Sequence, residues 1–217
     1  MKTIYFISGL GADHRLFKKQ IQANIPIIVL PWLIPEKNES IEIYAERMTH
    51  QIPPNRDPVI LGGVSFGGII AIEMSRHIPT EKIIILSSVK TSSEIPIHIK
   101  TWKYFPIYKI LGGNFLKKAG ILFRYFFGTM PLEEKATFLQ MVKDSDSYFV
   151  EWAADKICHW KNKDTPANLT HIHGSSDLIF PISKIKKPFI EIPKGTHLMV
   201  LTSSEKVNAL LKAELSE

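Results

Sequence analysis

The chain has 217 residues, of which 45% are hydrophobic and 22% are charged, and its formal net charge at pH 7 is +6. This length fits one domain with a sizeable core, and the balance of apolar and charged residues excludes an intrinsically disordered chain. The single cysteine, Cys158, excludes an internal disulfide and a metal site built from thiolates. The apolar run at 4–7 is too short for a signal-peptide core, and no run approaches the length of a membrane span. We therefore expect a cytoplasmic protein without stable membrane insertion.

Strands and helices alternate through the first ninety residues. Short apolar runs predict four buried strands, at residues 2–7, 25–30, 58–62 and 82–87. Helices are expected between them, at residues 13–23, 41–52 and 68–77, and Ser40 has the position of a cap for the second helix. This order is typical of βαβ units, so the sequence predicts an α/β fold with a mainly parallel sheet flanked by helices.

The alternation stops after residue 90. Residues 91–166 show helical periodicity without a credible strand, and two further strands are predicted at 169–173 and 188–193. Thr202-Ser203-Ser204-Glu205 then has the spacing of a capping box, which indicates the start of a last helix. The sequence therefore predicts that a long helical segment is inserted before the last two strands.

The third strand runs into Gly63-Val64-Ser65-Phe66-Gly67, which has the G-x-S-x-G spacing of a nucleophile elbow. A strand, a sharp bend and a helix would expose the hydroxyl of Ser65 at the end of the sheet. Side chains two residues to either side of the serine would collide in such a bend, and both positions are glycine. A structural turn that happens to contain serine is the alternative interpretation.

A serine nucleophile needs a base and an acid that orients the base. Asp177 follows the strand at 169–173 and His197 follows the strand at 188–193, in the order serine, acid, histidine. Ser175-Ser176-Asp177 is also typical of an ordinary turn, so Asp177 could be a turn residue only. In that case Glu94 is the alternative acid. We predict Ser65, Asp177 and His197 as catalytic residues.

With these motifs the chain resembles small α/β-hydrolase-fold proteins, in particular the esterase-like and thioesterase-like members. The resemblance implies one domain, 1–217, with a core of 1–90 and 167–217 and a helical lid of 91–166. The loop Ser8-Gly9-Leu10-Gly11 resembles the family's oxyanion loop, although many relatives have His-Gly where this chain has Ser-Gly. By resemblance, the backbone N–H groups of Leu10 and Phe66 would form the oxyanion hole.

The positive charge is concentrated in one segment. Residues 95–130 contain no Asp or Glu and hold six cations, Lys100, Lys103, Lys109, Lys117, Lys118 and Arg124, which equals the whole net excess. A solvated surface is one interpretation, and an anionic acyl substrate such as acyl-CoA, or an anionic lipid surface, is another. No recognised nucleic-acid motif accompanies the charge, so we expect no nucleic-acid partner.

Other candidates depend on weaker patterns. His14 after the first loop, and Trp102 and Phe126 among the aromatic residues of the helical segment, are candidate substrate contacts. Asp13 is alternatively a helix cap, and the aromatic residues are alternatively core. His171 and His173 alternate on a strand and share a face, but without a third ligand we favour packing over a metal site.

The combined interpretation is a serine hydrolase that cleaves a carboxylic ester or thioester of a small-to-medium acyl group, without a metal or organic cofactor. Two other classes remain open. One is a carbon–carbon lyase or synthase that resembles menaquinone-pathway members of this fold, and the other is a non-catalytic protein that binds a small ligand.

Overall fold

The computed structural model describes residues 2–54, 57–122, 127–128 and 130–216. Six strands form one parallel sheet in the order β2-β1-β3-β4-β5-β6. Their bounds are Ile4–Ile7 (β1), Ile27–Leu30 (β2), Val59–Val64 (β3), Thr80–Leu86 (β4), Leu169–Gly174 (β5) and Ile190–Ile192 (β6). All six predicted strands are therefore confirmed, to within a few residues at their ends.

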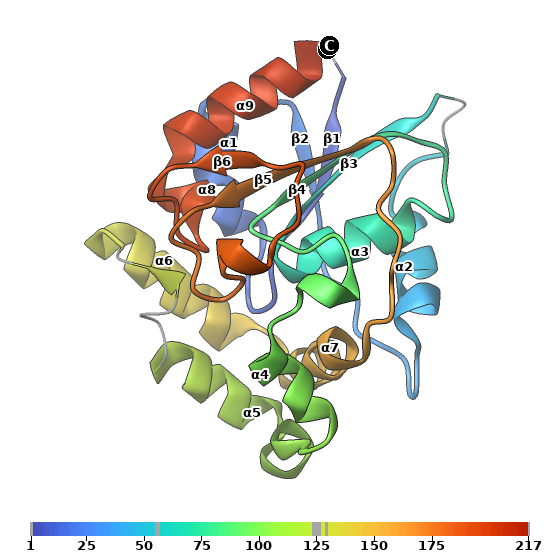
Figure 1. The fold of residues 1–217 in the computed structure, drawn as a ribbon, viewed down its shortest axis with the longest axis vertical. Helices are drawn as coiled ribbons and strands as arrows, with labels where there is room; N and C mark the ends of the chain where they lie inside the picture. The colour runs from blue at the N-terminus through green and yellow to red at the C-terminus, as the bar shows by residue number, and fades with distance from the viewer. Residues whose placement is uncertain (1, 55–56, 123–126, 129, 217) are drawn as a thin grey trace.

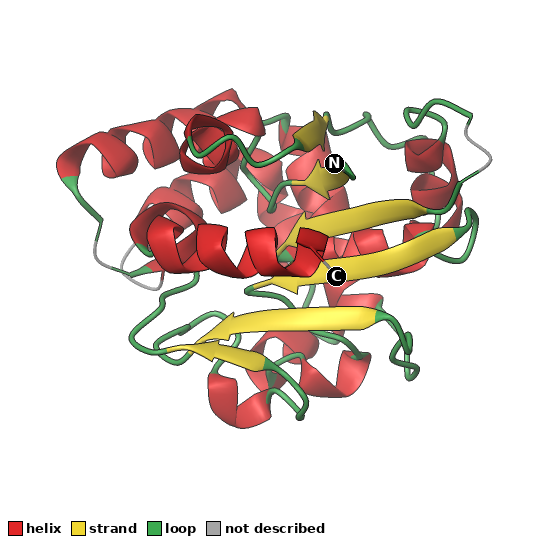
Figure 2. Cartoon of the chain, turned by 90° about the horizontal axis from the view of Figure 1, so that it is seen from above, coloured by secondary structure: helices red, strands yellow, loops and turns green. Residues whose placement is uncertain are grey.

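Helices cover both faces of the sheet (Figures 1 and 2). One face carries η1 (His14–Phe17), α1 (Lys18–Gln22), α8 (Met199–Thr202) and α9 (Ser204–Ser216), and the other carries α2 (Ile41–Thr49) and α3 (Phe66–Met74). Successive strand side chains point to opposite faces. In β4, Ile83 and Ile85 belong to the core under α2 and α3, whereas Ile84 and Leu86 belong to the core under α8 and α9. Because helices bury both faces of the sheet, both sets of side chains on a central strand such as β4 must be apolar.

Two helix predictions need correction at their ends. The helix expected at 13–23 is a 3-10 turn followed by the short α1, and Asp13 caps it by accepting a hydrogen bond from the Arg15 N–H. Thr202 does not open the last helix. It is the last residue of α8, where its hydroxyl donates to the carbonyl of Leu198, and α9 begins at Ser204. By contrast, Ser40 caps α2 as expected, through the N–H of Ile43.

The described part of the segment between β4 and β5 contains helices joined by loops, and no strand. We call residues 91–166 the helical insert; it contains η2 (Ser92–Glu94), α4 (Ile97–Lys100), η3 (Thr101–Lys103), α5 (Ile107–Leu122), α6 (Leu132–Asp144) and α7 (Ser147–His159). Its helices lie at the end of the molecule toward which β3 and β4 run (Figure 1). Phe149 and Trp152 anchor α7 in one core, and Phe138 and Met141 anchor α6 in the other. Within the described ranges, no helix has the length and apolarity needed to cross a bilayer.

The strand order fixes where a site can form. From β1 the chain moves outward to β2 and then returns to the other side of β1 with β3. The loops after β1 and β3 therefore leave the sheet in opposite directions and open a crevice at their carboxyl ends, which is where ligands bind in sheets of this kind.

Candidate active site

Ser65 occupies a sharp bend between β3 and α3. Its backbone has φ 53° and ψ −121°, a conformation that non-glycine residues rarely adopt. A Cβ at Gly63 would lie 2.2 Å from the Gly67 carbonyl oxygen, and a Cβ at Gly67 would lie 2.3 Å from the Ile7 carbonyl oxygen. The two glycines are therefore required by close backbone approach, as the motif predicts, and they allow Ser65 to sit at the end of β3.

His197 lies between Ser65 and Asp177. Its Nε2 is 2.9 Å from the Ser65 hydroxyl oxygen, and its Nδ1 is 2.8 Å from Oδ2 of Asp177. His197 and Asp177 are 3% and 2% exposed, so water competes little for these contacts. An ionised Asp177 accepts from Nδ1–H, which leaves Nε2 of a neutral imidazole free to accept the serine proton. The three residues predicted from the motif order are thus brought together in one chain of hydrogen bonds.

Asp177 is held in its charged form. Burial alone would raise its pKa, but the proximity of His197 and the N–H groups of Ile179 and Phe180, each 2.9 Å from Oδ1, outweigh burial. The pKa of Asp177 therefore lies below its ordinary value. Glu94, the alternative acid, accepts the backbone N–H groups of Lys90 and Lys186 and is committed to that role.

The loops that carry Asp177 and His197 are joined backbone to backbone. The Ser176 N–H donates to the Gly195 carbonyl at 2.8 Å, and the Ser175 N–H donates to the Ile192 carbonyl at 3.1 Å. A Cβ at Gly174 would lie 2.3 Å from the Gly195 oxygen. The absence of side chains at these glycines lets the two loops meet, and this contact fixes the acid relative to the imidazole.

The predicted oxyanion loop lies beside the serine. A Cβ at Gly9 would be 3.4 Å from the Ser65 Cβ, and the loop is closed by hydrogen bonds from the Ala12 N–H to the Gly9 carbonyl and from the Ser8 hydroxyl to the Ala12 carbonyl. Phe66 is the first residue of α3, so its N–H has no acceptor within the helix. The assignment of Leu10 and Phe66 as oxyanion donors stays a prediction.

A cavity of about 450 Å³ is lined by this loop, by the end of β2 and the loop after it, and by the junction of α6 with α7. Its walls are mainly apolar and include Trp32, Met141 and Phe149. The side chains of charged residues that line it in the described structure are carboxylates, from Asp13, Asp144 and Asp146. Ser8 and Gly11 also line it, so the same loop contacts both Ser65 and the cavity.

Comparisons with known proteins find similarity in structure but not in sequence. No family model matches the sequence, and no curated protein matches it. Solved structures are similar in fold. An esterase from Thermogutta terrifontis has a TM-score of 0.74 and 18% identity, and the match covers 100% of this chain and 90% of that one. An esterase from Exiguobacterium antarcticum has a TM-score of 0.74 and 16% identity, and the match covers 100% of this chain and 92% of that one. MenH from S. aureus is similar as well (TM-score 0.72, 15% identity, 99% and 93%). This chain has the α/β-hydrolase fold.

Within this α/β-hydrolase fold, the weaker candidates occupy different places. His14 lines the cavity, with a side chain that is 75% exposed. Trp102 stacks on Tyr108 with ring centroids 6.2 Å apart and is not part of the cavity lining. Phe126 lies outside the described residues. The substrate-binding role of all three stays a prediction.

Sequence reasoning missed the aromatic wall of the cavity. Trp32 stacks on Phe66 (5.6 Å between centroids) and contacts Phe149 (4.7 Å). The available signal was that Trp32 lies two residues after a predicted strand, where α/β-hydrolase loops gather around the nucleophile. Phe127 and Phe180 also lie against the His197 ring, at 5.7 and 5.6 Å.

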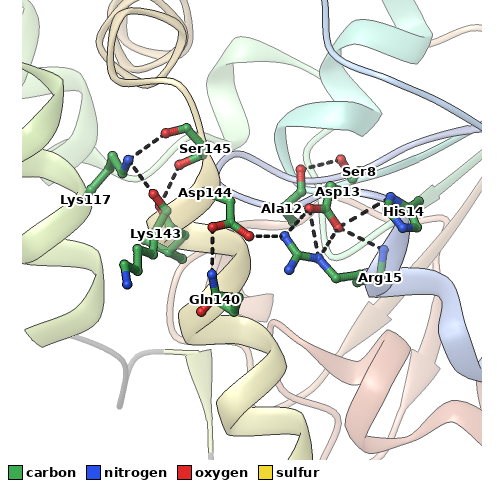
Figure 3. Close-up of polar contacts among 11 residues, drawn as sticks. Ser8, Ala12, Asp13, His14, Arg15, Lys117, Gln140, Lys143, Asp144 and Ser145 are labelled. Carbon is green, nitrogen blue, oxygen red and sulfur yellow. Dashed lines mark hydrogen bonds and ion pairs between the residues drawn. The ribbon is translucent and has the colours of Figure 1, made fainter.

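Arg15 ties the first loop to the helical insert (Figure 3). Its guanidinium contacts Asp13 and lies 2.8 Å from Oδ2 of Asp144 at the end of α6. Lys117 of α5 donates to the carbonyls of Lys143 and Ser145, at 2.7 and 2.6 Å. Lys117 therefore binds the carboxyl end of α6 and is not a free cation of the basic segment.

His171 and His173 form a buried pair behind Asp177. Nε2 of His173 donates to the Phe180 carbonyl at 2.8 Å, so its Nδ1 accepts from His171 Nε2 at 3.1 Å. Burial lowers the pKa of both imidazoles, which are therefore neutral. The described residues contain no cluster of three His, Cys, Asp or Glu side chains suited to a metal ion. The pair supports the loop that carries Asp177.

Proposed function

We propose that the protein is a serine hydrolase that cleaves a carboxylic ester through an acyl-enzyme. The observation that carries this proposal is the continuous hydrogen-bonded chain from the Ser65 hydroxyl through His197 to a buried, ionised Asp177. The esterases among the solved structures with this fold support the same class of reaction.

In the proposed reaction, Ser65 attacks the substrate carbonyl while His197 Nε2 takes the hydroxyl proton. Asp177 keeps the imidazole in the required tautomer and stabilises the imidazolium that forms. His197 then returns the proton to the leaving alcohol, and the C–O bond breaks to give an acyl-serine. Water, deprotonated by His197, attacks this ester and releases the carboxylic acid and free Ser65.

The N–H groups of Phe66 and Leu10 would stabilise the negative oxygen of each tetrahedral intermediate. The N–H of Phe66 lies at the positive end of the α3 dipole, which adds to this stabilisation. Each donor of this kind contributes about 10²–10³ in rate where it has been removed in other enzymes.

The cavity supplies the substrate preference. Its apolar wall suits an uncharged small-to-medium acyl or alcohol group, and its described lining has three carboxylates and no Lys or Arg. Arg15 partly balances the charges of Asp13 and Asp144, and the negative charge that remains, with that of Asp146, would repel the phosphates of a CoA conjugate. This lining favours a neutral ester over the anionic acyl-CoA that the basic segment suggests.

The test compares rates on matched acyl groups presented as neutral esters and as CoA thioesters, each with a Ser65→Ala control. We expect Ser65-dependent turnover that is faster on the neutral esters, and covalent labelling of Ser65 by a fluorophosphonate. Faster turnover of the thioesters would assign a thioesterase instead. An enzyme that is labelled at Ser65 but hydrolyses neither series would favour the lyase hypothesis instead.

A further inference from the structure

The helical insert exposes many large apolar side chains. Sixteen large hydrophobic residues are exposed in the described structure, and eight of them lie within residues 97–122. These eight are Ile97, Trp102, Tyr104, Phe105, Ile110, Leu111, Phe115 and Leu122. Half of the exposed large apolar residues thus come from a stretch of 26 residues. A concentration of this kind marks an interaction surface rather than the scattered exposure that is normal for a protein.

The packing of α5 explains why these side chains face outward. A Cβ at Gly113 would lie 1.7 Å from the Ser147 carbonyl oxygen, so α5 rests on the start of α7 by backbone contact. Tyr108, on the buried side, donates to Asp155 of α7 at 2.7 Å. Phe115 and Leu122 are seven residues apart, two helical turns, and are 45% and 67% exposed. The backbone of α5 is non-helical at Gly112, and the apolar side chains of Phe115 and Leu122 in the part after this kink therefore lie away from α7.

The elements of this surface lie together at one end of the molecule. Both α4 and α5 pack against α7 at the end of the molecule opposite α9 (Figure 1). Phe105, in the turn between η3 and α5, is 71% exposed, and Ile110 in the first turn of α5 is 81% exposed. We call the eight exposed apolar residues, with the lysines between them, the docking surface.

The charge of the docking surface has one sign. Residues 95–130 contain no Asp or Glu, and Lys103 and Lys118 are exposed while Lys100 is half-buried. Lys109 is paired with Asp155 at 3.0 Å and is not counted here. Exposed aromatic and aliphatic side chains flanked by lysines complement a lipid headgroup region, where rings enter the interface and ammonium groups contact phosphates.

We propose that the docking surface binds the protein peripherally to a bilayer that contains anionic phospholipid. This inference goes beyond the proposed hydrolase and does not depend on it. The protein would lie on the membrane through the docking surface, with Phe105, Ile110 and Phe115 entering the interface and Lys103 and Lys118 contacting headgroup phosphates. Among the described residues, no helix is long and apolar enough to cross the bilayer.

The test is cosedimentation with vesicles of phosphatidylcholine, with and without phosphatidylglycerol, at low and high salt. We expect binding to the anionic vesicles that weakens with salt, and a blue shift of Trp102 emission that is missing in Trp102→Phe. The single variants Lys103→Gln and Lys118→Gln should each lower the partition coefficient for anionic vesicles about fivefold. The Phe105→Ser/Phe115→Ser double variant should lose binding.

Ile43→Ser is the matched control, because Ile43 is 54% exposed on α2, away from the docking surface, and this variant should bind as the parent does. Hydrolysis of a soluble ester should be unchanged in the double phenylalanine variant, which separates docking from chemistry. The proposal is overturned if the folded parent protein fails to bind anionic vesicles, or if the double variant binds as well as the parent. A parent dimer that the double variant converts to monomer, without vesicle binding, would assign the surface to a second copy of this chain.

Discussion

Replacing Asp177 with Asn tests whether Oδ2 of Asp177 orients the His197 imidazole for the proposed reaction. Oδ1 of Asp177 accepts two backbone N–H groups at 2.9 Å, and Oδ2 accepts from His197 at 2.8 Å. The amide oxygen of Asn can keep the first two hydrogen bonds, which places its NH2 group opposite Nδ1 of His197. Nδ1 must then accept, so the imidazole proton moves to Nε2 and points at the Ser65 oxygen, 2.9 Å away.

The magnitude follows from this tautomer change. Ser65 keeps its neighbour but loses the acceptor for its proton, and a change of this kind lowers kcat by about 10⁴. At about 1.36 kcal/mol for each factor of ten, the loss of transition-state stabilisation is about 5.4 kcal/mol. Removal of the nucleophile in Ser65→Ala should cost more, on the order of 10⁶ in kcat.

The assay measures kcat and KM on a neutral chromogenic ester, and thermal unfolding checks that the Asp177→Asn protein is folded. Asp164→Asn is the control, because Asp164 is exposed and its hydrogen bonds in the described structure use its backbone and Asn162, and it should retain the parent rate. A folded Asp177→Asn protein with less than a tenfold loss, beside an inactive Ser65→Ala protein, would refute the orienting role of Asp177.

Three other predictions concern stability and reactivity. Gly67→Ala should destabilise the protein by more than about 2 kcal/mol in urea unfolding, since its Cβ would meet two carbonyl oxygens, and a parent-like midpoint would contradict the close approach. His171 and His173 have lowered pKa values, so the unfolded chain binds their protons first as pH falls below about 6.5. The free energy of unfolding should therefore be constant above that pH and decrease as the pH falls further, by up to about 1.4 kcal/mol per pH unit for each histidine. His171→Gln should reduce this dependence on pH, and an unchanged dependence would show that the His171 imidazole does not cause it. Burial raises the pKa of Cys158 to about 12, so a thiol reagent at pH 8 should react slowly with the native protein and quickly in urea; equal rates would mean that the thiol is accessible.

Much of the fold could be predicted because its signals are local. The strands are short apolar runs bounded by turns, and both faces of the sheet are buried, so each strand is apolar throughout. The elbow was recognisable because Gly63 and Gly67 are required by backbone approach. The positions of Asp177 and His197 followed from where strands end, since parallel strands deliver their following loops to one edge.

The cavity could not be predicted because it depends on contacts between distant segments. Trp32 and Phe149 meet across 117 residues of chain, the difference between their numbers, and no periodicity relates them. The basic segment was ambiguous for the same reason. Lys109 pairs with Asp155 of α7 and Lys117 binds carbonyls at the end of α6, and the composition of the segment alone does not reveal these contacts.

The pairing of β4 with β5 has a consequence for the order of events in folding. Leu86 is paired with Ile172, so this pairing closes a loop of 86 residues, the difference between the two numbers. Closing so long a loop carries an entropic cost that must be met before its contacts form, and such pairings are slow. Ser65 lies before the loop, and Asp177 and His197 lie after it. In refolding experiments, helical signal should therefore recover first, and a serine that can react should appear only at the end.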